Sequence, residues 1–301
     1  MIIKQRLPLG IIVRRTWHES LWIALACAAA YGIEYLLADH FALPTMIPPL
    51  LGTALAFFIG FSNSQAYDRW WEARTIWGAI VNESRSWARG CISYIREDGE
   101  HRMIERLVLR HIAFVYALKG ALRGTSTEQS GDEYRAYLSE AEFDQLQRKQ
   151  NKHNALLDLQ SRDLDALYAT NRIDGFKFME LNRRITTLCE EMGKCERIRN
   201  TVFPPTYNYY TRMFVWVFIV STTIVMVNAV GTLGVFIGFL LGYVFLVSHG
   251  IGTTLLNPFE QVIAGTPLDQ ISRNIEINLL EMLGKDGLPE PVHSIKNVYV
   301  T

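Results

Sequence analysis

The longest uncharged stretch of this 301-residue chain runs from Met213 to Ser248, and these 36 residues contain no Asp, Glu, Lys, Arg or His. One bilayer crossing needs about 20 apolar residues as an α-helix, so the stretch is long enough for two crossings. Gly231 and Gly234 lie near its middle, where a tight turn would join the two helices. The pattern predicts a membrane protein in preference to a buried helical hairpin of a soluble one.

Two further apolar segments precede this stretch. The first covers residues 21–37 and carries one charged residue, Glu34, close enough to its end for the carboxylate to reach the headgroup region. The second runs from about Ile47 to Ala66. We therefore expect an all-α membrane protein with four transmembrane helices per subunit and a large helical cytosolic region.

The distribution of basic residues predicts the orientation of these spans. Lys4, Arg6, Arg14 and Arg15 precede the first span, whereas residues 38–46, between the first two spans, contain no Lys or Arg. By the positive-inside rule both termini face the cytoplasm. The chain does not open like a cleaved signal peptide. We expect a multi-pass integral protein of the plasma (inner) membrane.

The spans divide the chain into five parts. These are an N-terminal cytosolic segment, transmembrane helices 1 and 2, a cytosolic helical region, transmembrane helices 3 and 4, and a C-terminal cytosolic segment, at residues 1–20, 21–66, 67–212, 213–250 and 251–301. Apolar spacing predicts cytosolic helices over residues 101–122, 133–147 and 176–199. In the last part, Thr266 is the expected N-cap of a helix with Pro267 at its first position.

The second span is expected to continue beyond the membrane as one helix. No proline occurs between Pro49 and Pro204, and nothing forbids helix until about Arg89. Forty helical residues are about 60 Å long. Because the hydrocarbon core is only about 30 Å thick, half of this helix would lie in the cytoplasm.

Along one face of that helix the side chains change from small and polar to aromatic, and then to amide and carboxylate. Thr53, Phe57 and Phe61 are spaced by four residues, and Gln65 and Asp68 continue nearly the same face. The face fits either ordinary packing inside a helix bundle or the lining of a pore. Since four spans enclose little space, a pore would require several subunits with this helix innermost.

Three motifs resemble those of the bestrophin family of ion channels. The run GFSNSQAYDRWWEAR is followed by a Pro-x-x-Tyr element before span three and by Asn-Pro-Phe after span four; the matching residues are Gly60, Arg69, Trp70, Trp71, Pro204, Tyr207, Asn257, Pro258 and Phe259. The resemblance covers nearly the whole chain.

The resemblance implies a homopentamer around a central pore that conducts anions such as chloride. It places the pore neck at Thr53, Phe57 and Phe61, and a cytosolic aperture at Phe203. The acidic run that forms a calcium clasp in animal members is missing after Phe259, so we expect no calcium gate of that kind.

Other functional classes are less well supported. Lys and Arg together number 30, as do Asp and Glu, so no net charge attracts nucleic acid. The sequence contains no phosphate loop and no nucleophile with a neighbouring base, so we do not expect an enzyme. We expect neither a cofactor nor a bound metal, because the spacing of the four cysteines is typical of buried thiols. The expected partners are further copies of the chain, membrane lipid and permeant inorganic ions. A sodium-selective channel of the same family and a non-conducting membrane scaffold remain alternatives. A secondary transporter would predict inverted repeats and a helix broken at mid-membrane, and neither pattern appears in the sequence.

Overall fold

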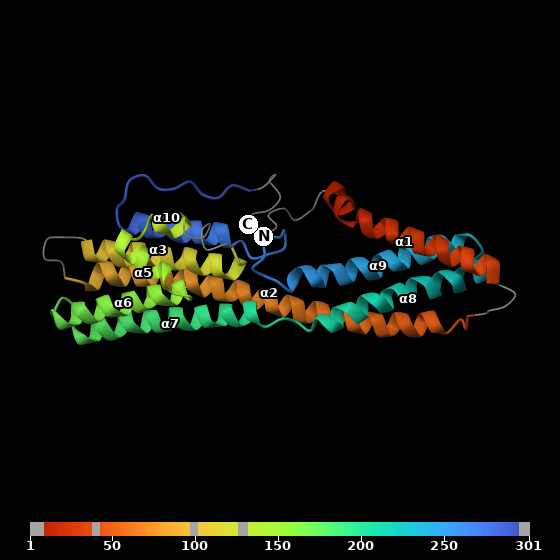
Figure 1. The fold of residues 1–301 in the computed structure, drawn as a ribbon, viewed down its shortest axis with the longest axis horizontal. Coiled ribbons are helices and arrows are strands. Elements are labelled where there is room, and N and C mark those ends of the chain that lie inside the picture. Colours follow the sequence, from red (N-terminus) through yellow and green to blue (C-terminus); the bar gives the residue numbers. More distant parts are fainter. Residues whose placement is uncertain (1–8, 38–42, 97–101, 126–131, 295–301) are drawn as a thin grey trace. The chain divides into compact units, whose positions relative to one another are not determined.

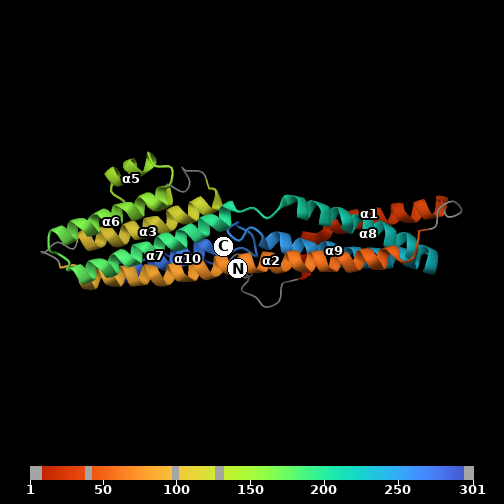
Figure 2. The same cartoon turned by 90° about the horizontal axis from the view of Figure 1, so that it is seen from below.

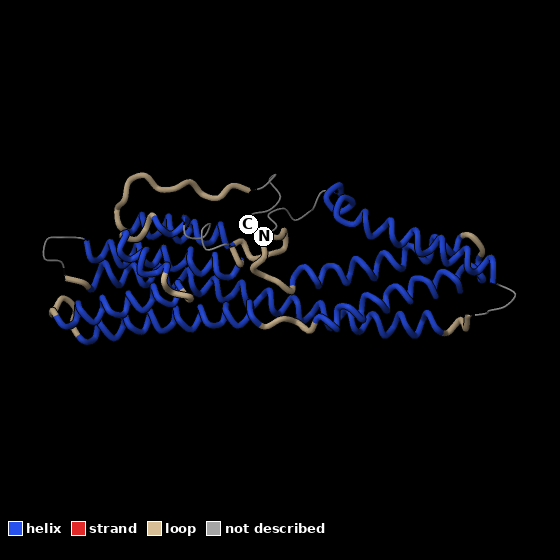
Figure 3. Tube along the Cα trace, viewed as in Figure 1, coloured by secondary structure: helices blue, strands red, loops and turns tan. Residues whose placement is uncertain are grey.

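The computed structural model describes residues 9–37, 43–96, 102–125 and 132–294, and these are helical with short connections (Figure 1). No strand occurs in that part of the chain (Figure 3). The helices are α1 Leu9–Leu37, α2 Ile47–Tyr94, α3 Arg102–Arg123, α5 Glu140–Gln147, α6 Lys152–Ala169, α7 Gly175–Asn200, α8 Pro205–Val230, α9 Leu233–Leu255 and α10 Leu268–Met282. The all-helical prediction is confirmed for the described residues.

The chain forms two compact units. The apolar unit contains the described residues up to Trp70 together with 202–258, and the polar unit contains 71–201 and the described residues from Phe259 on. Helix α2, of 48 residues, contributes its first half to the apolar unit and its second half to the polar unit.

The apolar unit is built from α1, α8, α9 and the first half of α2 (Figure 1). Three of its helices are long and apolar enough to cross a membrane: α2, α8 and α9. Gly231 separates α8 from α9 with a φ of 65°, a conformation that glycine adopts without a steric penalty. A β-carbon on Gly238 would lie 2.1 Å from the Thr223 hydroxyl, so α8 and α9 pack closely because glycine is present.

The polar unit is organised around α3. Figure 2 shows α3, α6, α7, α10 and the second half of α2 running lengthwise beside one another. Most of the α3 side chains are buried, including Ile112 and Phe114, and α2 contributes the fully buried rings of Trp77 and Trp87. Because α3 is buried on nearly every side, it lies at the centre of the hydrophobic core of the polar unit.

Buried charges of α3 are all paired. The Arg110 side chain is 3% exposed, and its guanidinium donates to Asp163 at 2.6 Å and also to Glu142. Lys119 donates to Glu133 at 2.7 Å and to Asp269, at the start of α10, at 3.0 Å. These pairs tie α3 to the surrounding helices.

Several local predictions were wrong. The single helix expected over 133–147 is interrupted, because Ser139 forms a capping box with Glu142 and starts α5 there. Helix α10 starts after Pro267, which is its N-cap, so Thr266 does not cap it. The prediction that all four thiols are buried was wrong for Cys189, which is exposed.

Candidate functional site

The first half of α2 has one packed face and one open face. Leu55 and Ile59 are at most 4% exposed and pack in the core of the apolar unit. Phe57 and Phe61, on the other side, are 73% and 50% exposed, and Thr53 is exposed as well. The hydroxyl of Thr53 donates to the Pro49 carbonyl at 2.9 Å, inside its own helix. The three predicted neck residues therefore lie on one exposed face, which nothing in this chain's described part covers.

The packed face of α2 is fixed by contacts that sequence spacing did not reveal. The Asn63 amide donates to the Ser248 carbonyl of α9 at 3.0 Å. A β-carbon on Gly252 would lie 2.0 Å from the Asn63 side-chain oxygen, so the amide fits only against a glycine. A polar residue within an apolar span was the available signal for Asn63, but its partners are about 185 residues away in the chain.

The Pro-x-x-Tyr element connects α8 to α2. Pro204 is the N-cap of α8, and the Tyr207 hydroxyl donates to the Phe58 carbonyl of α2 at 2.8 Å. The ring of Phe203, the predicted aperture residue, lies edge-on to the Tyr207 ring at 5.5 Å and is half-buried. A tyrosine at this position therefore fixes the start of α8 against the helix that carries Phe57.

The remaining motif residues take different positions. An added β-carbon on Gly60 would meet nothing within 4 Å, so the helix surface there is open. Arg69 and Trp70 are half-buried, whereas Trp71 is 56% exposed. In the last motif, Asn257 is exposed and Pro258 and Phe259 are buried.

Charged residues begin at the end of the open face. The Asp68 carboxylate is exposed and is paired with no basic side chain of the described residues. Glu72, one turn further along, accepts from Arg197 of α7 at 2.5 Å. Glu72 therefore has its ion-pair partner within its own chain.

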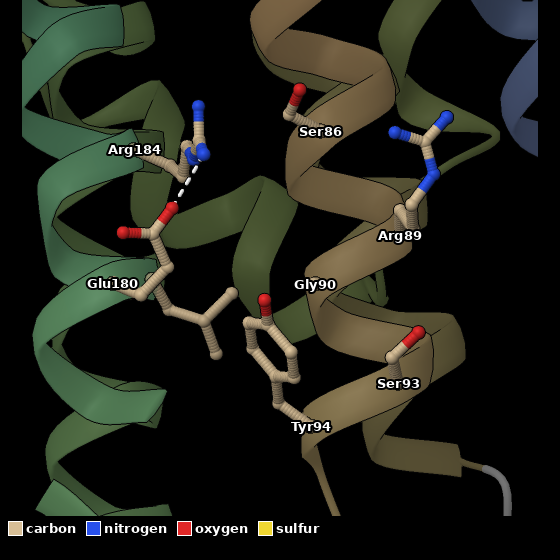
Figure 4. A pocket seen from close by; sticks show the side chains of 8 residues that line it. Ser86, Arg89, Gly90, Ser93, Tyr94, Glu180 and Arg184 are labelled. Atoms are coloured by element: carbon tan, nitrogen blue, oxygen red, sulfur yellow. Dashed lines mark hydrogen bonds and ion pairs between the residues drawn. The ribbon is translucent and has the colours of Figure 1, made fainter. Parts of the chain in front are cut away.

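A half-open cavity of about 180 Å³ lies between α2 and α7 in the polar unit (Figure 4). Figure 4 shows Glu180 and Arg184 on α7, and Ser86, Arg89 and Ser93 on α2. Arg184 donates to Glu180 and to Glu83, so its charge is compensated within the chain. The cavity is small and polar, and we assign it no ligand.

Two buried titratable groups of the polar unit were missed from the sequence. The Glu276 carboxylate of α10 accepts hydrogen bonds from the hydroxyls of Tyr116 and Tyr137, and burial raises the pKa of both phenols. His111 of α3 lies 2.8 Å from the Ser84 hydroxyl of α2, and burial lowers its pKa to about 3. Both are contacts between helices of the polar unit.

No group of three or more His, Cys, Asp or Glu side chains suited to a metal ion occurs among the residues that the structure describes.

Taken together, the features define an integral membrane protein of helices whose longest helix carries an exposed phenyl-lined face. A family model described as "Bacterial/Fungal Bestrophin protein" matches residues 6–281. The chain belongs to the bestrophin family, as the resemblance predicted.

The similarity to individual relatives extends over most of this chain and most of theirs. The chain is 28% identical to the voltage-dependent anion channel-forming protein YneE of Salmonella typhi over 284 residues, which is 94% of this chain and 85% of that protein. It is 26% identical to the YneE protein of Escherichia coli K12, over 92% of each. A crystal structure of a bacterial bestrophin homologue from Klebsiella pneumoniae has a TM-score of 0.83 and 26% identity, over 89% of this chain and 98% of that one.

Proposed function

We propose that the chain is one subunit of a homopentameric channel that conducts small anions such as chloride passively across the inner membrane. The observation that supports this most directly is the open face of α2, on which Phe57 is 73% exposed and Phe61 50% exposed. Lipid covers exposed phenyl rings in a membrane, but the same face of α2 also carries Thr53 and continues into Gln65 and Asp68, which are exposed. Polar and charged side chains are unfavourable against lipid, so this face is better suited to lining a water-filled pore. Five copies of α2 around one axis would form such a pore.

The neck would consist of three rings, at Thr53, Phe57 and Phe61. Phenyl rings form a hydrophobic constriction, which can stop conduction by dewetting. The edge of a phenyl ring carries partial positive charge, so edge-inward rings tolerate a passing anion. The Thr53 ring would be wider and wetter than the phenyl rings. A second restriction at Phe203 would face the cytoplasm, where Tyr207 supports its ring.

This proposal includes four membrane spans per subunit, with α1 as the fourth, and both termini in the cytoplasm. The division into residues 1–20, 21–66, 67–212, 213–250 and 251–301 belongs to it. The names of the relatives in Salmonella typhi and Escherichia coli support anions as the conducted species.

A cation-selective channel of the same architecture is the second candidate, and one observation favours it. Asp68 is exposed, and no basic side chain of the described residues pairs with it. A ring of carboxylates at the inner end of the neck would attract sodium or potassium.

The test is the reversal potential of the purified protein in planar bilayers under a KCl gradient. We expect a value nearer the chloride equilibrium potential than the potassium one. A value at the potassium potential would replace the anion channel by the cation channel. Absence of current under every condition would contradict both and favour a membrane scaffold.

A further inference from the structure

The Asp68 side chain lies on the same face of α2 as the two phenyl rings. An α-helix turns about 100° per residue, so Asp68 is displaced by about 20° from Phe57 around the helix, and Phe61 by about 40°. Asp68 therefore falls between the two phenyl positions in direction. It lies seven residues beyond Phe61, which is about 10 Å along the axis. All three residues belong to the apolar unit.

Asp68 is also the first formal charge that follows the phenyl rings. Residues 49–67 contain no Asp, Glu, Lys, Arg or His. The next acidic residue, Glu72, differs because Arg197 neutralises it at 2.5 Å. Asp68 thus combines exposure, alignment with the phenyl face and lack of an ion-pair partner in the described residues.

We propose that Asp68 forms a binding site for monovalent cations at the inner end of the neck and sets the anion-to-cation preference of the channel. The inference rests on the proposed function, because it needs several copies of α2 around one axis. Carboxylates at equivalent positions would form a ring, and a low-dielectric mouth lined by one sign of charge concentrates ions of the opposite sign. The ring raises the local concentration of potassium or sodium and lowers that of chloride.

The distance between Asp68 and Phe61 makes the effect of the carboxylate ring on ions in the neck measurable. The Debye length is about 10 Å at 0.1 M salt and about 3 Å at 1 M, and Phe61 is about 10 Å away along the helix. At low salt the carboxylate ring therefore acts on an ion in the neck, and at high salt it is screened. The potassium-to-chloride permeability ratio of the unmodified protein should fall as the salt concentration rises.

The decisive experiment is the reversal potential of Asp68→Asn in planar bilayers under a KCl gradient at low salt. We expect the potassium-to-chloride permeability ratio to fall about threefold or more, since focused fields change local ion concentrations by about tenfold or more. Asp68→Glu keeps the charge and should keep the ratio. Glu72→Gln, one turn away, should change the ratio less, because Arg197 already compensates Glu72.

The outcomes separate this proposal from the proposed function. Absence of current from the unmodified protein would contradict the channel itself. Normal currents with an unchanged ratio in Asp68→Asn would overturn the cation site alone. A loss of assembled oligomer in Asp68→Asn, with selectivity kept by the remainder, would assign Asp68 to a salt bridge between subunits. If Asp68→Asn does not fold, a salt-independent ratio in the unmodified protein overturns the site.

Discussion

At the scale of single residues, the exposed ring of Phe57 provides the simplest test of the neck. Phe57→Ala replaces a ring that is 73% exposed and lies edge-on to the ring of its neighbour Phe58. We expect an unchanged fold and a conductance that rises about twofold or more, because a hydrophobic constriction is widened and wetted. Single-channel recording measures this conductance.

Phe236→Ala is the matched control, because Phe236 is another exposed phenyl ring, at 62%, on α9 of the same unit. It should leave the conductance unchanged. Equal effects of both changes, or none from either, would remove Phe57 from the neck.

His111 is a single residue whose protonation should govern stability at low pH. The Ser84 hydroxyl donates to the Ile80 carbonyl at 2.6 Å, so the ring nitrogen of His111, 2.8 Å away, donates to Ser84. The other ring nitrogen, Nδ1, is buried and has no hydrogen-bond partner among the described residues. A proton placed there would be buried without a hydrogen bond, which is why the pKa is lowered to about 3.

The lowered pKa predicts acid sensitivity. The unfolded chain binds the His111 proton below about pH 6.5, whereas the folded protein does not until about pH 3, so stability falls as the pH drops between these values. At pH 5 the loss is about 2 kcal/mol. His111→Gln should melt lower at pH 7 but lose less stability between pH 7 and pH 5, as thermal unfolding would measure. Parallel pH profiles for the two proteins would contradict this.

At the scale of the elements, α3 depends on compensated buried charge. Arg110→Ala leaves the carboxylates of Glu142 and Asp163 without their buried partner, and breaking such a pair costs about 3–5 kcal/mol. We expect a fall in melting temperature of about 6 °C or more. Arg162→Ala breaks a pair with Asp158 in which both side chains are more than half exposed, and should change the melting temperature little. Similar shifts for both would show that burial of the pair is not decisive.

Secondary structure was largely predictable from the sequence because it depends on local patterns. The uncharged run and the absence of proline after Pro49 predicted the long helices, and α7 at Gly175–Asn200 covers the predicted 176–199. The errors concern where two helices begin. Ser139 forms a capping box within a segment whose apolar spacing predicted one continuous helix, and Pro267, not Thr266, is the N-cap of α10. The spacing of apolar residues is compatible with both the predicted and the observed start of each helix.

Contacts between distant helices were not predictable from one sequence. The fit of Asn63 against Gly252, and the two tyrosine hydroxyls on Glu276, join residues that no periodic pattern relates. The sequence also did not reveal that the Glu34 side chain is only 6% exposed, with one oxygen that has no partner among the described residues. Spacing along a helix fixes the direction of a side chain but not what it meets.

At the scale of the whole molecule, assembly is the step on which the pore depends. The open face of α2 carries Phe57 and Phe61, and Gly60 leaves an uncovered stretch of backbone beside them. Small residues allow helices to approach closely in a membrane. We therefore propose that neighbouring subunits contact each other at Gly60.

Gly60→Leu tests that contact. Nothing lies within 4 Å of an added β-carbon, and leucine favours helix over glycine by about 1 kcal/mol, so the isolated subunit should not be destabilised. The larger side chain would separate neighbouring subunits, and native mass spectrometry should show a lower fraction of pentamer. Gly32→Leu is the matched control, since Gly32 of α1 is equally open and lies outside the proposed contact. A pentamer that survives Gly60→Leu would exclude close packing at this residue, whereas a monomeric unmodified protein would contradict the pore itself, because the neck rings exist only between subunits.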